Sequence, residues 1–414
     1  MRAALSGLTT RGRCLLAAGF AAGLCSVVLN ERDLLRVAIF VIALPVLAAV
    51  LAARARVGLR AERQLVPSRV AVGSATEVRL VVRSSGALPS GGLLLEDGVP
   101  YALGNRPRFV VERLPRHGAT PLSYPLRPVL RGVQQVGPLL ARVTDPFGLA
   151  EFERELAGHS RLVVVPRVHA LTGLAIGAGT GGGTEGAVRR RAGQGEDDSV
   201  VRPYRHGDDL RKVHWRSTAR RDELMVRVEE QPWRGGTTVL IDHRLVAHRG
   251  SGPTASLEWA VSFAASVCVH LHRLGEQVRL VDEDGQELAA GQAGADSGAV
   301  LDALAAVQPS HRRDLLWHTD PAAGQELVAV LGAAAPATVS ELARSRPRGA
   351  RSLAVLLDVA AWANANEESA PDPAGAARLL RGAGWQVAVA RPTLSMDQVW
   401  RELGQGVSTP TEVG

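Results

Sequence analysis

The sequence has very little lysine and few aromatic residues. Lys212 is the single lysine among 414 residues, and aromatic residues make up 4% of the chain. The net charge of +7 therefore comes from arginine, and acidic residues are interspersed among the arginines. A nucleic-acid-binding surface needs a basic stripe interleaved with aromatic residues, and the sequence shows no such stripe. We therefore expect no nucleic-acid partner.

Cysteine is scarce as well. Cys14, Cys25 and Cys268 are too few and too scattered for a disulfide framework or a zinc site, which fits a reducing compartment. The Gly-rich stretch GTGGGTEG (179–186) lacks the lysine of a phosphate-binding loop. We interpret 171–200 as a flexible linker and expect no cofactor.

Two long apolar runs lie near the N-terminus, at 14–30 and 37–53. Each has about 17 residues, the short end of what crosses a bilayer. A signal peptide is the alternative for the first run. The second run follows almost at once, which favours a two-helix membrane hairpin over 1–58. Pro45 is compatible with it, because membrane helices tolerate proline.

Arginines flank the hairpin on one side. They are Arg2, Arg11 and Arg13 before it, and Arg54, Arg56, Arg60 and Arg63 after it. The connecting loop balances two arginines with two acidic residues. The positive-inside rule then predicts that both ends of the hairpin, and so the soluble domains, are cytoplasmic. We expect a two-helix, multi-pass protein of the cell membrane, with the lipid bilayer as a partner.

A β-sandwich-like domain is predicted at 59–170. Apolar and polar residues alternate with period two in short segments such as EVRLVVR (77–83), separated by turn residues. Short strands at this spacing are typical of an antiparallel β-sandwich. The segment DPFGL (145–149) reads as a turn near its end. Asp145 would begin the turn, Gly148 would permit a positive φ, and Phe147 and Leu149 would anchor it in the core.

From 231 to 405 strands and helices alternate. Apolar strand-like runs occur at 237–242, 277–282, 326–332, 352–359 and 385–391, and helical patterns at 255–274, 298–307, 338–344, 373–383 and 395–404. This alternation predicts an α/β domain with a parallel sheet covered on both faces. We expect 406–414 to be a disordered tail. The predicted fold class is therefore α/β plus β.

The segment 201–230 concentrates polar and aromatic residues between two apolar regions. We call it the signature segment; its notable residues are Arg202, Tyr204, Gly207, Asp208, Asp209, Arg211, Trp215 and Arg220. Asp208 is placed to cap a helix. Asp208, Arg211 and Trp215 would then share one face of that helix.

This segment resembles the signature of the family called domain of unknown function 58, a family without established chemistry. The hairpin and the DPFGL turn agree with the resemblance. It implies that the C-terminal domain is similar to the Rossmann-like von Willebrand factor type A fold. Metal-binding members of that fold end their first strand in D-x-S-x-S. Here Asp242 is followed by Arg244 and Val246 at the hydroxyl positions. The position is degenerate, so we expect no metal.

Three interpretations of the signature segment stay open. In the first, Asp208 pairs with an arginine while Trp215 and Tyr204 cover a joint between domains. In the second, the exposed aromatic and arginine side chains bind a partner protein. In the third, His206, His214 and Asp208 form an acid–base set, although no nucleophile with a base partner is evident.

The resemblance also implies partners. Members of the family are often encoded beside MoxR-type AAA+ ATPases and transglutaminase-like membrane proteins. This implies a non-catalytic, membrane-anchored adaptor or scaffold that works with such an ATPase in envelope-related assembly. The alternative function is a hydrolase with its site at the junction of the β-domain and the helix of the signature segment.

Overall fold

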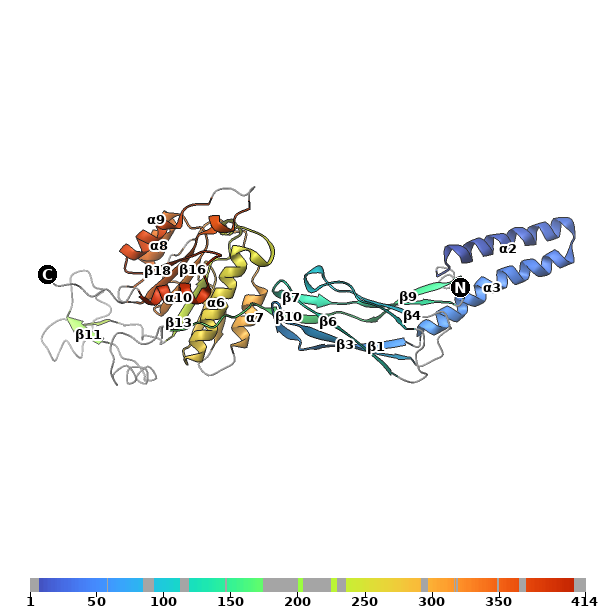
Figure 1. The fold of residues 1–414 in the computed structure, drawn as a ribbon, viewed down its shortest axis with the longest axis horizontal. Helices are drawn as coiled ribbons and strands as arrows, with labels where there is room; N and C mark the ends of the chain where they lie inside the picture. Colours follow the sequence, from blue (N-terminus) through green and yellow to red (C-terminus); the bar gives the residue numbers. More distant parts are fainter. Residues whose placement is uncertain are drawn as a thin grey trace. The chain divides into compact units, whose positions relative to one another are not determined.

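The computed structural model describes residues 7–57, 59–84, 93–111, 119–145, 147–173, 200–203, 225–228, 236–291, 297–315, 317, 319–347, 350–364 and 370–405. Of 52–57, 84, 200–203 and 225–228 it describes the backbone only. The chain divides into two compact units, Met1–Val165 and Pro166–Gly414 (Figure 1). The second unit thus begins a few residues before the boundary expected at 170.

The first unit opens with two helices, α2 (Thr10–Leu29) and α3 (Arg32–Val57). Gly19 lies against Ile42 and Gly23 against Ala38, so the two helices run antiparallel. Both helices are long and apolar enough to cross a membrane by length and composition, over Thr10–Leu29 and Arg32–Leu51.

Small residues allow the two helices to approach closely. Gly19 and Ser26 are buried on α2 at seven-residue spacing, and small residues where helices meet are typical of packed membrane helices. Gly12, also buried on α2, lies against the carbonyl of Leu149 instead. Asn30 ends α2 in the left-handed conformation, with φ of 52°, which an asparagine tolerates better than most residues.

The rest of the first unit is built from short strands. They are β1 (Leu59–Val66), β2 (Arg69–Ala71), β3 (Thr76–Ser84), β4 (Leu93–Asp97), β5 (Arg108–Val111), β6 (Ala119–Leu126), β7 (Gly132–Val136), β8 (Leu139–Thr144), β9 (Glu151–Ala157) and β10 (Ser160–Val165). They form sheets with the orders β1-β3-β6, β2-β10-β7 and β5-β4-β8-β9. The pairing is antiparallel except between β2 and β10, which are parallel, so the expectation of a purely antiparallel domain is wrong at this pair.

One apolar core joins the three sheets. Inward-facing residues alternate along the strands, as with Leu93 and Leu95 on β4 or Leu139, Ala141 and Val143 on β8. This alternation is the period-two pattern of a sheet with one buried face. The β part of the predicted α/β plus β fold class is therefore confirmed.

The second unit begins its described elements with β11 (Val200–Pro203) and β12 (Met225–Val228), which pair antiparallel. An α/β domain follows. Its elements are β13 (Thr237–Ile241), α6 (Ser256–Arg273), β14 (Val278–Val281), β15 (Glu287–Gly291), α7 (Gly298–Ala306), β16 (Glu326–Leu331), α8 (Pro336–Ser345), β17 (Ser352–Leu357), α9 (Pro373–Gly382), β18 (Gln386–Ala390) and α10 (Met396–Gln405).

The six-stranded sheet of this domain has the order β15-β14-β13-β16-β17-β18. All neighbouring pairs are parallel except β14 with β15, an antiparallel edge strand that the sequence analysis did not identify. Helices α6, α7 and α10 pack on one face, and α8 and α9 pack on the other (Figure 1). The prediction of a largely parallel sheet with helices on both faces is confirmed.

Candidate functional site

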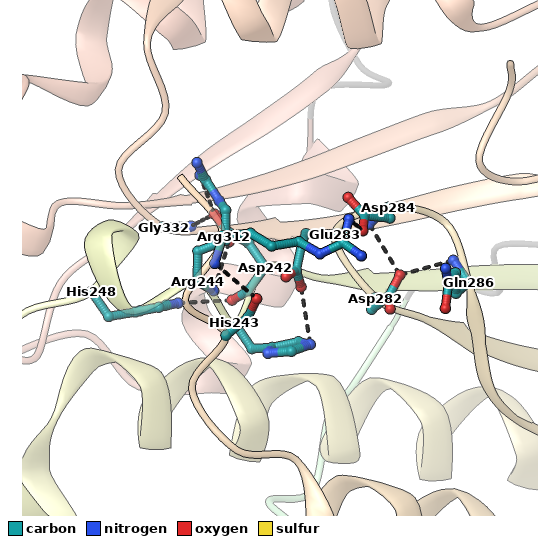
Figure 2. Close-up of polar contacts among 11 residues, drawn as sticks. Asp242, His243, Arg244, His248, Asp282, Glu283, Asp284, Gln286, Arg312 and Gly332 are labelled. Atoms are coloured by element: carbon teal, nitrogen blue, oxygen red, sulfur yellow. Dashed lines mark hydrogen bonds and ion pairs between the residues drawn. The ribbon is translucent and has the colours of Figure 1, made fainter. Parts of the chain in front are cut away.

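The carboxyl edge of the six-stranded sheet carries the main polar cluster of the second unit. Asp242 follows β13, Asp282 to Asp284 follow β14, and Gly332 follows β16, and Figure 2 shows these residues drawn together. The strand order reverses between β14–β13 and β13–β16. In open α/β sheets, ligands bind outside the carboxyl ends of the strands at such a switch point.

Asp242 is fully buried, and both of its carboxylate oxygens are occupied by donors of the same chain. The Arg244 guanidinium donates from Nε to Oδ1 at 2.9 Å and from Nη2 to Oδ2 at 2.8 Å. The backbone N–H of Arg244 reaches Oδ1 at 3.1 Å and that of Gly332 reaches Oδ2 at 3.3 Å. Arg244 therefore supplies the positive charge that the buried carboxylate requires.

Two further guanidinium donors of Arg244 also have acceptors. They bond to the backbone carbonyls of Arg313 at 2.8 Å and Ala333 at 3.2 Å. The side chain is 6% exposed. The next two residues, by contrast, are exposed: Leu245 by 52% and Val246 by 45%. Two apolar side chains therefore lie on the surface immediately after the closed Asp242–Arg244 pair.

His248 and Ser256 form a hydrogen-bonded pair next to this cluster. His248 Nε2 lies 2.7 Å from the carbonyl oxygen of Asp242, and Nδ1 lies 3.1 Å from Ser256 Oγ. Burial lowers the pKa of His248, which fits a neutral ring that donates from Nε2 to the carbonyl and accepts at Nδ1. Ser256 is fully buried and its Oγ accepts the N–H of Arg249. A nucleophile needs access to substrate, so this pair is structural.

His243 and Glu283 form a second charge pair at the same edge, with Nε2 and Oε2 3.0 Å apart. Burial opposes the charge of Glu283, but hydrogen bonds from His243 and Ser310 outweigh it and lower its pKa to about 2. Burial likewise lowers the pKa of His243, yet the bond and charge of Glu283 outweigh burial, so the pKa is raised overall. The two groups thus favour each other's charged forms.

The turn after β14 is acidic and internally bonded (Figure 2). Asp282 Oδ1 accepts the backbone N–H groups of Asp284 at 3.0 Å and Gln286 at 2.8 Å. Arg312 forms an ion pair with Asp284. Burial is the main cause that raises the pKa of Asp284. In this turn, the carboxylate of Asp284 is therefore paired with Arg312 and that of Glu283 with His243.

A similar pairing occurs further along the sheet. Asp358 follows β17 and accepts a hydrogen bond from Arg391 at 2.9 Å. Within the described part of the chain, no group of three or more His, Cys, Asp or Glu residues is placed to hold a metal ion. Asp242, Glu283, Asp284 and Asp358 each have a basic partner from this chain.

The signature segment is described at its two ends only. The backbones of β11 and β12 pair so that Val200 lies opposite Val228 and Arg202 opposite Val226. The two ends of the signature segment therefore lie next to each other. The other predicted residues, Tyr204, Gly207, Asp208, Asp209, Arg211, Trp215 and Arg220, lie outside the described residues, as do His206 and His214.

The DPFGL turn connects the β-strands of the first unit to the helical hairpin. Asp145 accepts the N–H groups of Phe147 at 2.8 Å and Ala150 at 2.5 Å, and Gly148 has φ of 67°. Leu149 is buried, as expected. The expectation that Phe147 anchors the turn in the core is wrong, because its side chain is 61% exposed. Leu149 packs against Leu8 and α3 rather than against the core of the β-sheets.

A buried network in the first unit was not anticipated. The Arg63 guanidinium donates to both carboxylate oxygens of Asp97, at 3.0 and 2.5 Å, and the Tyr124 hydroxyl donates to Asp97 at 2.6 Å. Burial, followed by the Asp97 hydrogen bond, raises the pKa of Tyr124. The partners are 34 and 27 residues apart in sequence, so no local pattern indicates the pairing.

Comparison with protein families gives one relevant match. The family described as "Protein of unknown function DUF58" matches residues 200–330, a range that contains the whole signature segment and the sheet as far as β16. This match supports the resemblance to the domain of unknown function 58 family. Comparison with curated proteins gives no match.

Two solved structures show distant likenesses to this chain. The CARDB domain of a Pyrococcus furiosus protein, in complex with di-metal ions, is 16% identical with a TM-score of 0.19, covering 26% of this chain and 89% of that one. Cwp6 from Clostridium difficile is 10% identical with a TM-score of 0.15, covering 84% of this chain and 39% of that one. These likenesses are too weak to inform the fold or the function.

Proposed function

We propose that this chain is a non-catalytic, membrane-anchored adaptor that binds a MoxR-type AAA+ ATPase in envelope-related assembly. The observation that carries the proposal is the pairing of Asp242 with Arg244 at the switch point of the sheet. A carboxylate whose oxygens are filled by internal donors has to lose those bonds before it binds a metal ion or acts as a base. The carboxyl edge of this sheet therefore suits binding of a partner protein rather than metal binding or catalysis.

Membrane anchoring is supported by the surface of the hairpin. Large apolar side chains of α2 and α3 are exposed to the surroundings; they are Phe20, Leu24, Val27, Val28, Leu29, Leu35, Val37, Ile39, Phe40, Val46, Leu47, Val50 and Leu51. Exposing so many apolar side chains to water is unfavourable, whereas lipid solvates them. The arginine flanks favour a cytoplasmic position for the β-strand part of the first unit and for the second unit.

The orientation is tested with reporter fusions after Arg63. A fluorescent or β-galactosidase reporter should be active there, and alkaline phosphatase should be inactive. Active alkaline phosphatase would place the soluble units on the outside and remove a cytoplasmic ATPase from consideration as the partner.

The proposal includes a von Willebrand factor type A-like assignment for the α/β domain. Numbered within that domain, its sheet order is 3-2-1-4-5-6, with the third strand antiparallel. Asp242 ends the first strand, where the metal-binding members carry their aspartate. The sheet order is shared with other doubly wound folds, so the position of Asp242 is the more specific support.

Two features of the second unit suit a protein partner. Leu245 and Val246 are exposed beside the closed Asp242–Arg244 pair. The signature segment carries Trp215, Tyr204 and several arginines, which are residue types that dominate binding energy at interfaces. A transglutaminase-like membrane protein is the second partner that the family resemblance suggests.

The experiment is co-purification of the full chain, in detergent, with the MoxR-type ATPase encoded nearest to it. Trp215→Ala and Leu245→Asp should each lower the affinity by at least about tenfold. Leu379→Asp is the matched control, because Leu379 lies on α9 and is 42% exposed. Failure of the unaltered chain to capture the ATPase, or equal capture by all variants, would refute the proposal.

Trp215→Ala also separates two interpretations of the signature segment. If Trp215 is packed as a structural clamp, its loss should lower the free energy of unfolding by roughly 3–5 kcal/mol. If Trp215 is a docking residue, the free energy of unfolding should change little while capture of the ATPase is lost. Denaturant titration of the same variant provides the comparison.

A further inference from the structure

The DPFGL turn holds Phe147 in a defined position. Both oxygens of the Asp145 carboxylate accept backbone N–H groups of the turn, including that of Phe147 at 2.8 Å. Gly148 adopts a positive φ and its N–H bonds to the carbonyl of Asp145 at 3.0 Å. A turn with these internal bonds presents the same residue outward at all times, and that residue is an exposed phenylalanine.

The same turn is bonded to the start of α2. The Thr9 N–H donates to the carbonyl of Leu149 at 3.0 Å, and the Thr9 hydroxyl donates to the carbonyl of Gly148 at 2.7 Å. Leu8 forms a β-bridge with Ala150. Thr9 is also the residue that caps α2. The turn and the helix start are therefore one bonded element.

Contacts on α2 and on α3 independently indicate where the DPFGL turn lies relative to the apolar runs of the hairpin. On α2, Gly12 lies against the carbonyl of Leu149, and the apolar run begins two residues later, about 3 Å along the helix axis. On α3, Ala48 and Ala49 share an apolar cluster with Leu149, and the second apolar run ends at 53. Ala48 and Ala49 lie four to five residues before that end, so both helices place the turn within about 8 Å of the ends of the apolar runs.

The residues around the turn have the chemistry of a membrane interface. Arg11 and Arg13 are exposed on the first turn of α2, and the Arg11 side chain reaches Gly148. Arginine at this level favours anionic lipid headgroups, and an exposed aromatic ring beside it favours the boundary between headgroups and acyl chains.

We propose that Phe147 inserts into the lipid interface, so that the DPFGL turn docks the β-strand part of the first unit directly on the membrane surface. The inference rests on the proposed membrane anchoring and adds a second, lipid-contacting site to it. One fixed side of the β-strand part then lies against the bilayer, whereas a part tethered only through a linker could turn any side toward it.

The test uses the full chain with Cys14 and Cys25 replaced by alanine. Cys268 is retained, since burial raises its pKa to about 12 and a buried thiol does not react with maleimides. A single cysteine replaces Phe147 and carries an environment-sensitive fluorophore. The protein is reconstituted into phosphatidylcholine–phosphatidylglycerol vesicles whose lipids carry a spin label near the headgroup or in the middle of the acyl chain.

Two matched positions serve as controls. Phe40→Cys reports on the middle of the candidate membrane span Arg32–Leu51 of α3, where the Phe40 side chain is 68% exposed. Tyr101→Cys reports on a site that is 96% exposed and follows Asp97 on β4. Asp97 pairs with Leu139, at the end of β8 opposite to Asp145, so Tyr101 lies at the far end of the sheet from the turn.

The expected result is fluorescence quenching at 147 by the shallow spin label that exceeds quenching at 101 by about twofold or more. Position 40 should be quenched mainly by the deep label. If 40 is quenched while 147 behaves like 101, the turn does not contact lipid and this inference fails, while membrane anchoring stands. The same result would follow if a protein partner or a second copy covered Phe147 instead. If 40 is not quenched, the anchoring itself fails and the inference fails with it.

Discussion

Arg244 binds Asp242 through two parallel hydrogen bonds, from Nε and Nη2 to the two carboxylate oxygens at 2.9 and 2.8 Å. The two residues are separated by one position, and both are buried at the carboxyl edge of β13. Breaking a buried pair by removing one partner leaves an uncompensated charge, and that costs more than the pair contributed. This makes Arg244 a stability determinant at the carboxyl edge of the sheet.

We predict that Arg244→Met lowers the free energy of unfolding of the second unit by roughly 3–5 kcal/mol. Arg391→Met should cost less than about 1 kcal/mol, because Arg391 pairs with Asp358 at the same edge but its side chain is 60% exposed. All seven tryptophans lie in the second unit, so tryptophan fluorescence in a urea titration reports on this unit. Equal costs for the two variants would contradict the buried-pair interpretation.

A second prediction concerns divalent cations. We expect calorimetric titration of the full chain with magnesium or manganese to give no micromolar site at Asp242, because the Arg244 guanidinium repels a cation and occupies both oxygens. The decisive variant is Asp242→Asn. A binding signal in the unaltered chain that disappears in this variant would show that Arg244 moves aside to admit a metal.

Much of the architecture follows from local sequence patterns. The apolar runs near the N-terminus, the period-two segments after 59 and the strand–helix alternation after 231 each depend on neighbours within one element, so periodicity predicts them. The edge strand β15 escaped prediction. Its sequence, ELAAG, lacks the β-branched and aromatic residues that mark strands.

The polar sites depend on contacts that sequence spacing does not encode. The sequence has Arg244 where metal-binding members of the von Willebrand factor type A fold have a hydroxyl residue, and this predicted that a metal ion would be repelled. It did not predict that the Arg244 guanidinium would bind Asp242 itself. Phe147 was expected in the core because apolar turn residues usually point inward. The turn instead packs Leu149 against the hairpin, which leaves its neighbouring apolar residue exposed.

A third prediction follows from the His243–Glu283 pair. The pKa of Glu283 is lowered to about 2, so its contribution is complete above its ordinary value of 4.5 and is lost as pH falls from there toward 2. The pKa of His243 is raised above 6.5, so its contribution is complete below 6.5 and is lost as pH rises through the raised pKa. Both contributions are therefore present together between about pH 5 and 6.

Glu283→Gln should accordingly reduce the free energy of unfolding most at pH 5 to 6, by roughly 2 kcal/mol after allowance for solvent screening. The difference from the unaltered chain should shrink at pH 8 and again below pH 4. Urea titrations across this range measure it. Glu287→Gln is the control, since Glu287 pairs with Arg279 but its side chain is 52% exposed, and its effect should be small and flat. A flat profile for Glu283→Gln would contradict the charged pair.

The last prediction concerns the Arg63–Asp97–Tyr124 network in the first unit. Asp97 is fully buried and accepts hydrogen bonds from both partners, while the Arg63 side chain is 1% exposed. Arg63 also donates to the carbonyls of Val136 at 3.0 Å and Gly158 at 2.5 Å. One guanidinium thus joins β1 to β4, to the end of β7 and to the connection between β9 and β10.

Removing one member should have a graded effect. Arg63→Met leaves the Asp97 carboxylate buried without its cation and should cost roughly 3–5 kcal/mol. Tyr124→Phe removes one donor to a charged acceptor and should cost roughly 1.5–3 kcal/mol. The double variant Arg63→Met with Asp97→Leu removes both charges, and we expect it to recover much of the loss, because an apolar pair of similar volume needs no desolvation of charge.

Because the first unit contains no tryptophan, hydrogen–deuterium exchange of β1 and β4 peptides measures these effects, since core-strand amides exchange through opening of the unit. Exchange should accelerate most in Arg63→Met, and less in Tyr124→Phe and in the double variant. If the double variant exchanges faster than Arg63→Met, the loss is not caused by a stranded carboxylate, and the bonds from Arg63 to the carbonyls of Val136 and Gly158 hold the sheets together instead.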